Sequence, residues 1–506
     1  MSILARGRHF VKTLGQDTKH WGDNTSFRAR SPDVYASHSL FLKVQLTDLR
    51  LQPTLVRLTP PRTIGRIARY MKVRFISHAS ILVETNGLSI LSDPWLSGKV
   101  FNNGWALVSP ADQPDFSKIS HIWISHEHPD HFHFPSLKAV PDADKERITI
   151  LHQRHASPRI VDALRKMGFA RIVELPLYKW RRLEAGVEVY CGSSGAMDSF
   201  LAIRDGDQCL LNMNDCVFIP EQLRYIKRQI GDVSILFTQF SFANWVGNDH
   251  DETRSAARKI EQLKSQKSIF KPTYTVPFAS FCYFCNRENS RQNPWVNTPD
   301  TIAHLGLPGL NFMYPGDEWN SSSGGFDTEK ALDRYRDDYA RMVIDDTPAT
   351  KDLAEVNEAV EARLKEFKAK VRPAALAKLP PFSIYLHDLN AVVEIDPPRG
   401  TCGAFEGDPL RNASARFVMC SQVAWFTFAF SFGGNTTMIS GMFLDREFAT
   451  KGWHPFFSTQ TVLSTEIHRR GDLQATLRTA NFWWRKKGEL FYRRVGALKG
   501  NTVTDD

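Results

Sequence analysis

Four side chains of types that commonly bind metal ions lie within the segment His126-Glu-His-Pro-Asp-His131. They are His126, His128, Asp130 and His131. A tight loop that leaves a strand can direct the two alternate histidines at one metal ion, while the adjacent Asp–His pair turns towards a second ion. Imidazole and carboxylate groups suit zinc and iron equally well, so the segment predicts one or two divalent ions, zinc or iron. The alternative is a histidine-rich loop that binds no metal.

A further carboxylate, Asp215, follows the apolar run Cys209-Leu-Leu-Asn-Met213. Just past a strand, this side chain can bridge two metal ions. A turn or helix-capping role is the alternative for a single aspartate in such a place. We therefore add Asp215 to the predicted metal ligands.

Short apolar strands alternate with helices from Met71 onwards. The predicted strands are residues 73–76, 80–84, 88–91, 119–125, 188–191, 200–203, 209–213 and 233–237, and the predicted helices are 136–140, 159–167 and 251–266. Asn86-Gly87 stands between two of these strands and is typical of a hairpin turn. This alternation predicts a layered α/β domain that ends near residue 320.

Changes in composition divide the chain into four parts. They are an N-terminal extension, residues 1–70; the α/β domain, 71–320; a helical linker, 321–375; and a β-rich C-terminal domain, 376–506. In the last part, the alternating apolar segments 382–386, 391–395 and 437–444 indicate strands. The aromatic run 422–432 is expected to form a plain β core with Gly433-Gly434-Asn435 as the turn. The wall of a pocket for an apolar or planar ligand, and a homodimer interface, are the alternatives.

Composition excludes several classes of protein. The chain has 506 residues, of which 42% are hydrophobic and 24% charged, which is ordinary globular usage and not that of a disordered chain. The net charge of +9 comes without a basic block or a nucleic-acid motif, so no nucleic-acid partner is expected. Seven cysteines without regular spacing predict a reducing compartment, and Cys282 and Cys285 are expected to be buried structural cysteines. With neither a secretory signal nor a transmembrane segment in sight, we expect a cytoplasmic protein.

The segment His126–His131 resembles the HxHxDH signature of the metallo-β-lactamase superfamily. Residues 75–84 and 91–98 resemble the entry hairpin of the branch that includes CMP-N-acetylneuraminate hydroxylase, ascorbate-phosphate lactonases and N-acylphosphatidylethanolamine phospholipase D. The likeness to the hydroxylase family continues at Met197-Asp198, 211–216 and 276–279. It spans about residues 71–320 and implies an α/β fold, the αββα sandwich, with its metals at the sheet edge.

Two positions depart from the pattern of that family. Ser194 stands where relatives place a third histidine of the first metal site, and Phe278 lies in the segment where many members place a last histidine. The candidate replacements, as metal ligands or as residues that orient ligands or contact substrate, are Ser194, Asp198, His250, His78 and Asp93. Each has an alternative: His250 as an exposed residue at a helix start, the others as hydrogen-bonded structural residues.

The residues and the resemblance together predict a metal-dependent hydrolase. It would act on a small anionic substrate through a metal-bound hydroxide, with Asp130 as the catalytic proton acceptor. Arg287 is a candidate contact for the anion, with a surface ion pair as its alternative. A second reading is a non-haem di-iron oxygenase that draws electrons from a separate electron-transfer partner, because the two Cys-x-His pairs of a Rieske cluster do not occur in this sequence. A third is a metal-poor binding protein on the same fold.

Overall fold

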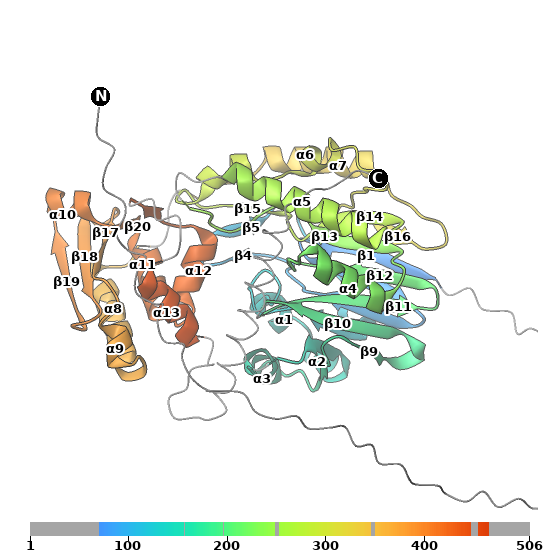
Figure 1. Cartoon of the computed structure of the whole chain (residues 1–506), viewed down its shortest axis with the longest axis horizontal. Helices are drawn as coiled ribbons and strands as arrows, with labels where there is room; N and C mark the ends of the chain where they lie inside the picture. The colour runs from blue at the N-terminus through green and yellow to red at the C-terminus, as the bar shows by residue number, and fades with distance from the viewer. Residues whose placement is uncertain are drawn as a thin grey trace, which may run out of the picture. The chain divides into compact units, whose positions relative to one another are not determined.

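The computed structural model describes residues 70–155, 157–195, 197–247, 252–345, 350–446 and 454–464. The predicted extension, apart from its last residue, lies outside the described residues, as does His250. The described part contains two sheet-based regions, an α/β domain and a C-terminal region (Figure 1).

Two facing sheets form the centre of the α/β domain. The first has the strand order β16-β1-β2-β3-β6-β7-β8, with β16 Glu318–Asn320, β1 Met71–Ser77, β2 Ser80–Thr85, β3 Leu88–Ser92, β6 His121–Ile124, β7 Thr149–Gln153 and β8 Arg171–Leu175. The second has the order β10-β11-β12-β13-β14, with β10 Glu188–Ser194, β11 Asp198–Asp205, β12 Gln208–Asn212, β13 Ile235–Gln239 and β14 Tyr274–Phe278. Buried side chains from both sheets, among them Phe75, Val83, Phe237 and Val276, share one core.

Helices cover the outer faces of both sheets. On the first sheet, α1 (Phe134–Lys138) and α3 (Arg159–Lys166) contribute Leu137, Ile160 and Leu164 to a second apolar cluster. On the other sheet, α4 (Pro220–Ile230) and α5 (Glu252–Phe270) contribute Leu223 and Phe270 to a third. Helix, sheet, sheet and helix thus form four layers, which confirms the predicted αββα sandwich.

The predicted hairpin and most predicted strands of this domain are confirmed. Strands β2 and β3 pair antiparallel across Asn86 and Gly87, whose φ angles of 46° and 81° suit a two-residue turn. In the two central sheets and the helices that cover them, the sequence pattern missed β7, β8, β14, β16, α2 (Asp142–Arg147) and α4. A third, three-stranded sheet joins β15 (Cys282–Phe284), β5 (Trp105–Leu107) and β4 (Lys99–Val100).

The two helices of the predicted helical linker pack into different hydrophobic cores. Helix α7 (Thr328–Ala340) packs Leu332 and Tyr335 into the core of the α/β domain. Helix α8 (Leu353–Lys370) begins at a capping box between Asp352 and Glu355 and packs Phe367 into the core of the C-terminal region. The two helices are therefore parts of the regions that they adjoin.

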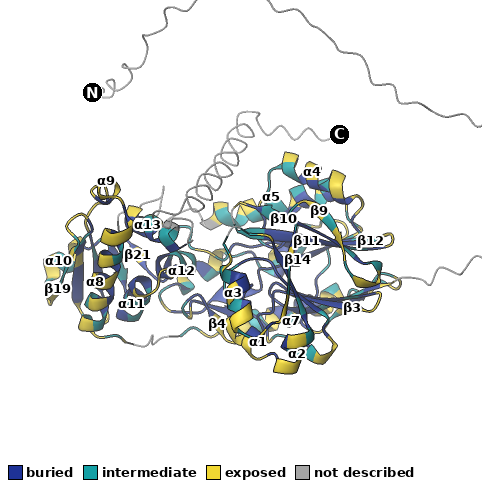
Figure 2. Cartoon of the chain, turned by 90° about the horizontal axis from the view of Figure 1, so that it is seen from below, coloured by how far each residue is buried: buried dark blue, intermediate teal, exposed yellow. Residues whose placement is uncertain are grey.

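A five-stranded sheet supports the C-terminal region, as predicted, and several helices pack against it. The strand order is β19-β18-β17-β20-β21, with β19 Thr401–Glu406, β18 Ala391–Asp396, β17 Phe382–Leu386, β20 Phe417–Met419 and β21 Leu444–Asp445. The other helices are α9 Pro373–Leu376, α10 Pro409–Ser414, α11 Ser421–Ala429, α12 Gly433–Ser440 and α13 Pro455–Ser464. Figure 2 shows that α11 is largely buried while α10 is exposed.

Two local predictions in this region are wrong. The aromatic run 422–432, expected as a β core, lies mostly in α11, and residues 437–440, expected as strand, belong to α12. Gly433 does not form a β-turn: it begins α12, where a Cβ atom would lie 2.3 Å from the carbonyl oxygen of Phe426. Glycine at this place allows the two helices to approach closely.

Among the described residues, none of the helices combines the length and the apolar character that a membrane crossing requires.

Candidate metal centre

The predicted ligands come from loops at one edge of the two sheets. Strands β3 and β6 are parallel, and Asp93 and the segment His126–His131 follow their carboxyl ends directly. Asp215 follows β12 in the other sheet, and Asp198 opens β11. His78 lies in the turn between β1 and β2. Residues separated by more than a hundred positions therefore meet at this edge.

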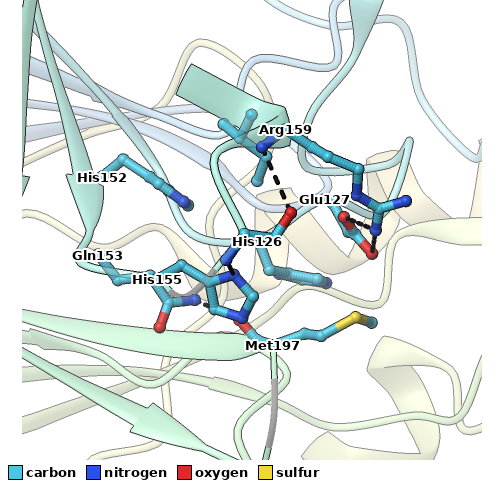
Figure 3. A pocket seen from close by; sticks show the side chains of 9 residues that line it. His126, Glu127, His152, Gln153, His155, Arg159 and Met197 are labelled. Atoms are coloured by element: carbon cyan, nitrogen blue, oxygen red, sulfur yellow. Dashed lines mark hydrogen bonds and ion pairs between the residues drawn. The ribbon is translucent and has the colours of Figure 1, made fainter. Parts of the chain in front are cut away.

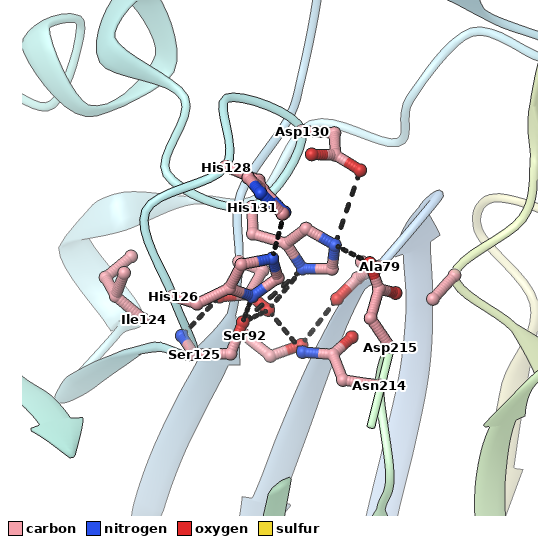
Figure 4. Close-up of polar contacts among 12 residues, drawn as sticks. Ala79, Ser92, Ile124, Ser125, His126, His128, Asp130, His131, Asn214 and Asp215 are labelled. Carbon is pink, nitrogen blue, oxygen red and sulfur yellow. Dashed lines mark hydrogen bonds and ion pairs between the residues drawn. The ribbon is translucent and has the colours of Figure 1, made fainter. Parts of the chain in front are cut away.

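Seven of these side chains form three overlapping groups. In each group, one potential ligand atom per residue lies within 4.8 Å of the others. The groups are His78, Asp130 and His131; His126, His131 and Asp215; and His126, His128 and Asp198. His131 and His126 each belong to two groups, so the three form one continuous cluster. Figure 4 shows its members His126, His128, Asp130, His131 and Asp215.

His131 lies at the centre of the cluster. Its Nε2 atom is 3.2 Å from Asp215 Oδ2 and 3.4 Å from Asp130 Oδ2, and the same Asp130 oxygen is 3.4 Å from His78 Nε2. All atoms of the His131 side chain are buried. At the other end of the cluster, His126 Nε2 is 2.8 Å from His128 Nδ1 and 3.8 Å from Asp198 Oδ1.

Asp93 fixes the orientation of the His131 ring through the ring nitrogen Nδ1. Its Oδ2 atom lies 2.9 Å from His131 Nδ1 and also accepts hydrogen bonds from Ser125 Oγ and Asn214 Nδ2, while Oδ1 accepts from the Ser125 backbone N–H. A carboxylate that accepts a hydrogen bond from one ring nitrogen directs the other nitrogen of the same histidine towards a metal. Asp93 and Asn214 both have positive φ, 34° and 48°, which these two residue types tolerate.

Ser194 does not join the cluster. The Ser194 hydroxyl donates to the carbonyl oxygen of Val217 at 2.8 Å and accepts from its N–H at 3.2 Å. Ser194 thus fixes the loop that carries Asp215, two residues before Val217. His250 lies outside the described residues, and Arg287, the candidate anion contact, is exposed.

The cluster shifts the pKa values of its members in opposite directions. Burial alone would lower the pKa of His131, but Asp130 and Asp215 outweigh it and hold that pKa well above its ordinary value. For His126, burial and the neighbouring histidines hold the pKa well below its ordinary value. Burial opposes ionisation of Asp215, yet His131 lowers its pKa to about 2, whereas burial raises the pKa of Asp198 to about 6. Without a metal, a proton on His131 therefore neutralises part of the negative charge.

The residues present fit a divalent metal. His131 Nε2, Asp130 Oδ1 and His78 Nδ1 are buried and have no hydrogen-bond partner within the described parts of the chain. Burial of a polar atom without a hydrogen-bond partner costs free energy, and coordination of a metal ion can offset that cost. Because neutral imidazole and ionised carboxylate are the ligand forms, a metal ion can replace the proton between His131 and the two aspartates.

A small pocket lies beside His126 (Figure 3). Its lining residues are His126, Glu127, His152, Gln153, His155, Ser157, Arg159, Ile160 and Met197. Arg159 Nη2 donates to both carboxylate oxygens of Glu127, at 2.7 and 2.6 Å, and Nη1 donates to the carbonyl oxygen of Ser464. Of these residues, His126 and Met197 were named from the sequence but His152 and Gln153 were not, because their strand β7 was not predicted.

Cys282 and Cys285 are buried free cysteines, as expected. Burial raises the pKa of the Cys285 thiol to about 11 and also raises that of Cys282, which disfavours the thiolate form that binds metals.

A comparison with protein families decides which superfamily this edge-of-sheet cluster belongs to. Residues 72–240 match the family model described as a beta-lactamase superfamily domain. This part of the chain is a metallo-β-lactamase superfamily domain. The match includes all seven residues of the cluster and Asp93, and the resemblance drawn from the sequence is confirmed.

Curated relatives of this metallo-β-lactamase domain are named as hydroxylases or as Rieske proteins. Cytidine monophosphate-N-acetylneuraminic acid hydroxylase of Danio rerio is 27% identical over 217 residues, which are 39% of this chain and 36% of the relative. A Mycobacterium tuberculosis protein provisionally named as a Rieske 2Fe-2S iron-sulfur protein is 26% identical over 210 residues, 39% of this chain and 40% of the relative. The chain thus matches less than half the length of these relatives.

Solved structures with some likeness to the metallo-β-lactamase domain include both hydroxylases and hydrolases. The di-iron β-hydroxylase CmlA of Streptomyces venezuelae has 16% identity and a TM-score of 0.36, over 50% of this chain and 53% of that one. The metallo hydrolase Igni18 of Ignicoccus hospitalis has 15% identity and a TM-score of 0.33, over 50% of this chain and 98% of that one.

Proposed function

We propose that the chain is a metal-dependent hydrolase that acts on a small molecule at the cluster around His131. The observation that carries this proposal is the convergence of side chains on His131 Nε2, which lies 3.4 Å from Asp130 Oδ2 and 3.2 Å from Asp215 Oδ2 and is itself buried without a hydrogen-bond partner among the described residues. We assign the metal ligands to the cluster: His126, His128 and Asp198 at one end, Asp130, His131 and His78 at the other, with Asp215 between them.

These residues would hold a divalent ion, which would supply Lewis acidity for activating a water molecule and polarising a substrate oxygen. The residues of the chain provide the rest. Asp93 fixes the ring of His131, so that Nε2 faces Asp130 and Asp215. Asp130 offers Oδ1, which has no hydrogen-bond partner within the described residues, as an acceptor for the proton released by water.

Two other residues would take the places of the two histidines that the family pattern leads one to expect. Asp198, near His126, would replace the histidine whose position in the sequence is occupied by Ser194, and His78, near Asp130, would replace the last histidine. The backbone N–H of Ala279, in the segment that lacks the last histidine, donates to the carbonyl oxygen of His78. The altered segment thus supports the turn that presents His78.

A di-iron oxygenase is the second candidate, and the names of the curated relatives favour it. Three aspartates among seven ligands also suit iron, because carboxylates and imidazoles together form the shells of non-haem iron sites. In this candidate the electrons come from a separate protein partner.

Elemental analysis of protein purified without oxygen separates these candidates. Stoichiometric zinc without iron supports the hydrolase, whereas iron together with a visible absorption band supports the oxygenase and contradicts the hydrolase. Protein that contains no metal, and whose melting temperature does not change with added zinc, iron or manganese, contradicts both and supports the metal-poor binding protein.

A further inference from the structure

Lys259 and Gln239 lie next to the metal centre and have no part in the ligand set. Lys259 belongs to α5, and Gln239 ends β13. Lys259 Nζ donates a hydrogen bond to Gln239 Oε1. Gln239 Nε2 in turn donates to Asp215 Oδ1 at 3.3 Å and to the carbonyl oxygen of Ala279 at 3.4 Å. A fixed amide therefore stands between the ammonium group and the central carboxylate.

The position of α5 is itself fixed against the loop of Asp215. Gln262, three residues after Lys259, donates from Nε2 to the carbonyl oxygen of Cys216 at 3.1 Å. Both side chains belong to one turn of the helix, since residues three apart share a face. The helix thus holds the ammonium group of Lys259 at a set place beside the metal centre.

The ammonium group of Lys259 has more hydrogen-bond donors than the described residues accept. Such a group has three N–H donors, and Gln239 is its one hydrogen-bond partner among the described residues. None of the described carboxylates forms an ion pair with it, although Asp215 and Asp198 act on it electrostatically. Burial lowers the pKa of Lys259, and these two carboxylates oppose that shift. A partly desolvated cation with free donors is well suited to bind an oxyanion.

Other cations around the site are less suited to this task. Arg159 donates hydrogen bonds to the Glu127 carboxylate through Nη2 and to the backbone carbonyl oxygen of Ser464 through Nη1. Arg287 is exposed. Lys259 combines proximity to the ligands with donors that other described residues leave unmatched.

We propose that Lys259 recognises an oxyanion of the substrate, a carboxylate or phosphoryl group, beside Asp215, with Gln239 positioning its ammonium group. This inference rests on the proposed function, because it places the anionic end of the substrate next to the hydrolytic centre. Lys259 would then set substrate specificity without holding metal.

Titration calorimetry with inorganic phosphate, and separately with acetate, tests this assignment. The variants are Lys259→Met, which removes the charge; Lys259→Gln, a smaller neutral change that serves if the first does not fold; and Lys259→Arg, which retains the charge. The matched control is Lys264→Met, an exposed lysine of the same helix that pairs with Glu261. Metal content is measured for each protein.

We expect the neutral variants to bind one or both anions at least tenfold more weakly than wild type, with Lys259→Arg restoring most of the affinity and Lys264→Met unchanged. A weaker phosphate affinity alone identifies a phosphoryl group, and a weaker acetate affinity alone a carboxylate. Unchanged affinity for both anions, with metal content intact, overturns this inference and leaves the hydrolase standing. Loss of metal in Lys259→Met also overturns it, because Lys259 would then act through the ligands. A metal-free wild type instead contradicts the proposed function, and phosphate binding that still depends on Lys259 would support the inference alone.

Discussion

The candidate metal centre and the core of the C-terminal region bury different kinds of side chain. At the candidate centre, His78, His131 and Asp130 are almost completely buried although they are polar or charged. In the C-terminal core, Phe367 and Phe456 are equally buried and stack with ring centroids 4.3 Å apart. Burial of apolar rings stabilises a fold, whereas burial of unpartnered polar atoms costs free energy.

This difference indicates where function lies. The three groups of potential metal ligands found among the described residues all belong to the α/β domain. A cluster that lowers stability persists when it serves another purpose, as strained or unsatisfied groups at functional sites do. We therefore expect substitutions in the two places to change different properties. Those in the apolar core should change stability, and those in the candidate metal centre should change metal binding.

The largest expected effect on stability is that of Phe456→Ala. The side chain is fully buried and packs against Phe367 and Phe382, so its removal should lower the free energy of unfolding by about 3–5 kcal/mol. Metal content should not change. Chemical denaturation measures the effect, with Phe432→Ala as control, because Phe432 is 48% exposed in the same region. A loss below about 1 kcal/mol for Phe456→Ala would contradict the described core.

Asp93→Asn should weaken metal binding by about 10- to 100-fold, because the hydrogen-bond acceptor that orients His131 loses its charge. A competition titration against a chelating dye measures this affinity. The exposed Asp232, replaced in Asp232→Asn, is the control and should bind metal like wild type. Equal metal affinity in both variants would show that Asp93 does not orient a ligand.

Stability is also expected to depend on pH in the C-terminal region. Burial, assisted by Arg416, lowers the pKa of His454 to about 4, so the folded state favours the neutral ring. The stability that depends on this neutral form is present above pH 6.5 and is lost as the pH falls from 6.5 towards 4, by at most about 1.4 kcal/mol per pH unit.

His454→Asn provides the comparison for this pH effect, because it removes the titrating group and keeps an acceptor for the Phe456 N–H. Urea denaturation between pH 7.5 and 4.5 should show wild type losing stability relative to the variant as the pH falls. Parallel curves for the two proteins would contradict the assigned burial.

The sequence alone could predict those members of the cluster that are adjacent in the chain. The spacing from His126 to His131, directly after a strand, needs no tertiary information. His78 and Asp198 were named among the replacements, but only the folded arrangement places them at opposite ends of the cluster. Gln239 and Lys259 have no motif, and their relation to Asp215 depends on the packing of α5 against β13.

The errors in the C-terminal region have a physical cause. Helices α11 and α12 are rich in aromatic and β-branched residues and are buried on several sides. Such helices lack the polar stripe that gives a 3.6-residue period, so composition favours strand. The charged helix α8, by contrast, has a polar face and a capping box and was predicted correctly.

Elemental analysis of His131→Ala beside wild type tests most directly whether this cluster binds metal. His131 belongs to two of the three ligand groups, so wild type should carry a stoichiometric divalent metal and the variant should lose most of it. The exposed His304, replaced in His304→Ala, is the matched control and should retain the metal. A folded His131→Ala protein that keeps the full metal content of wild type would contradict the account.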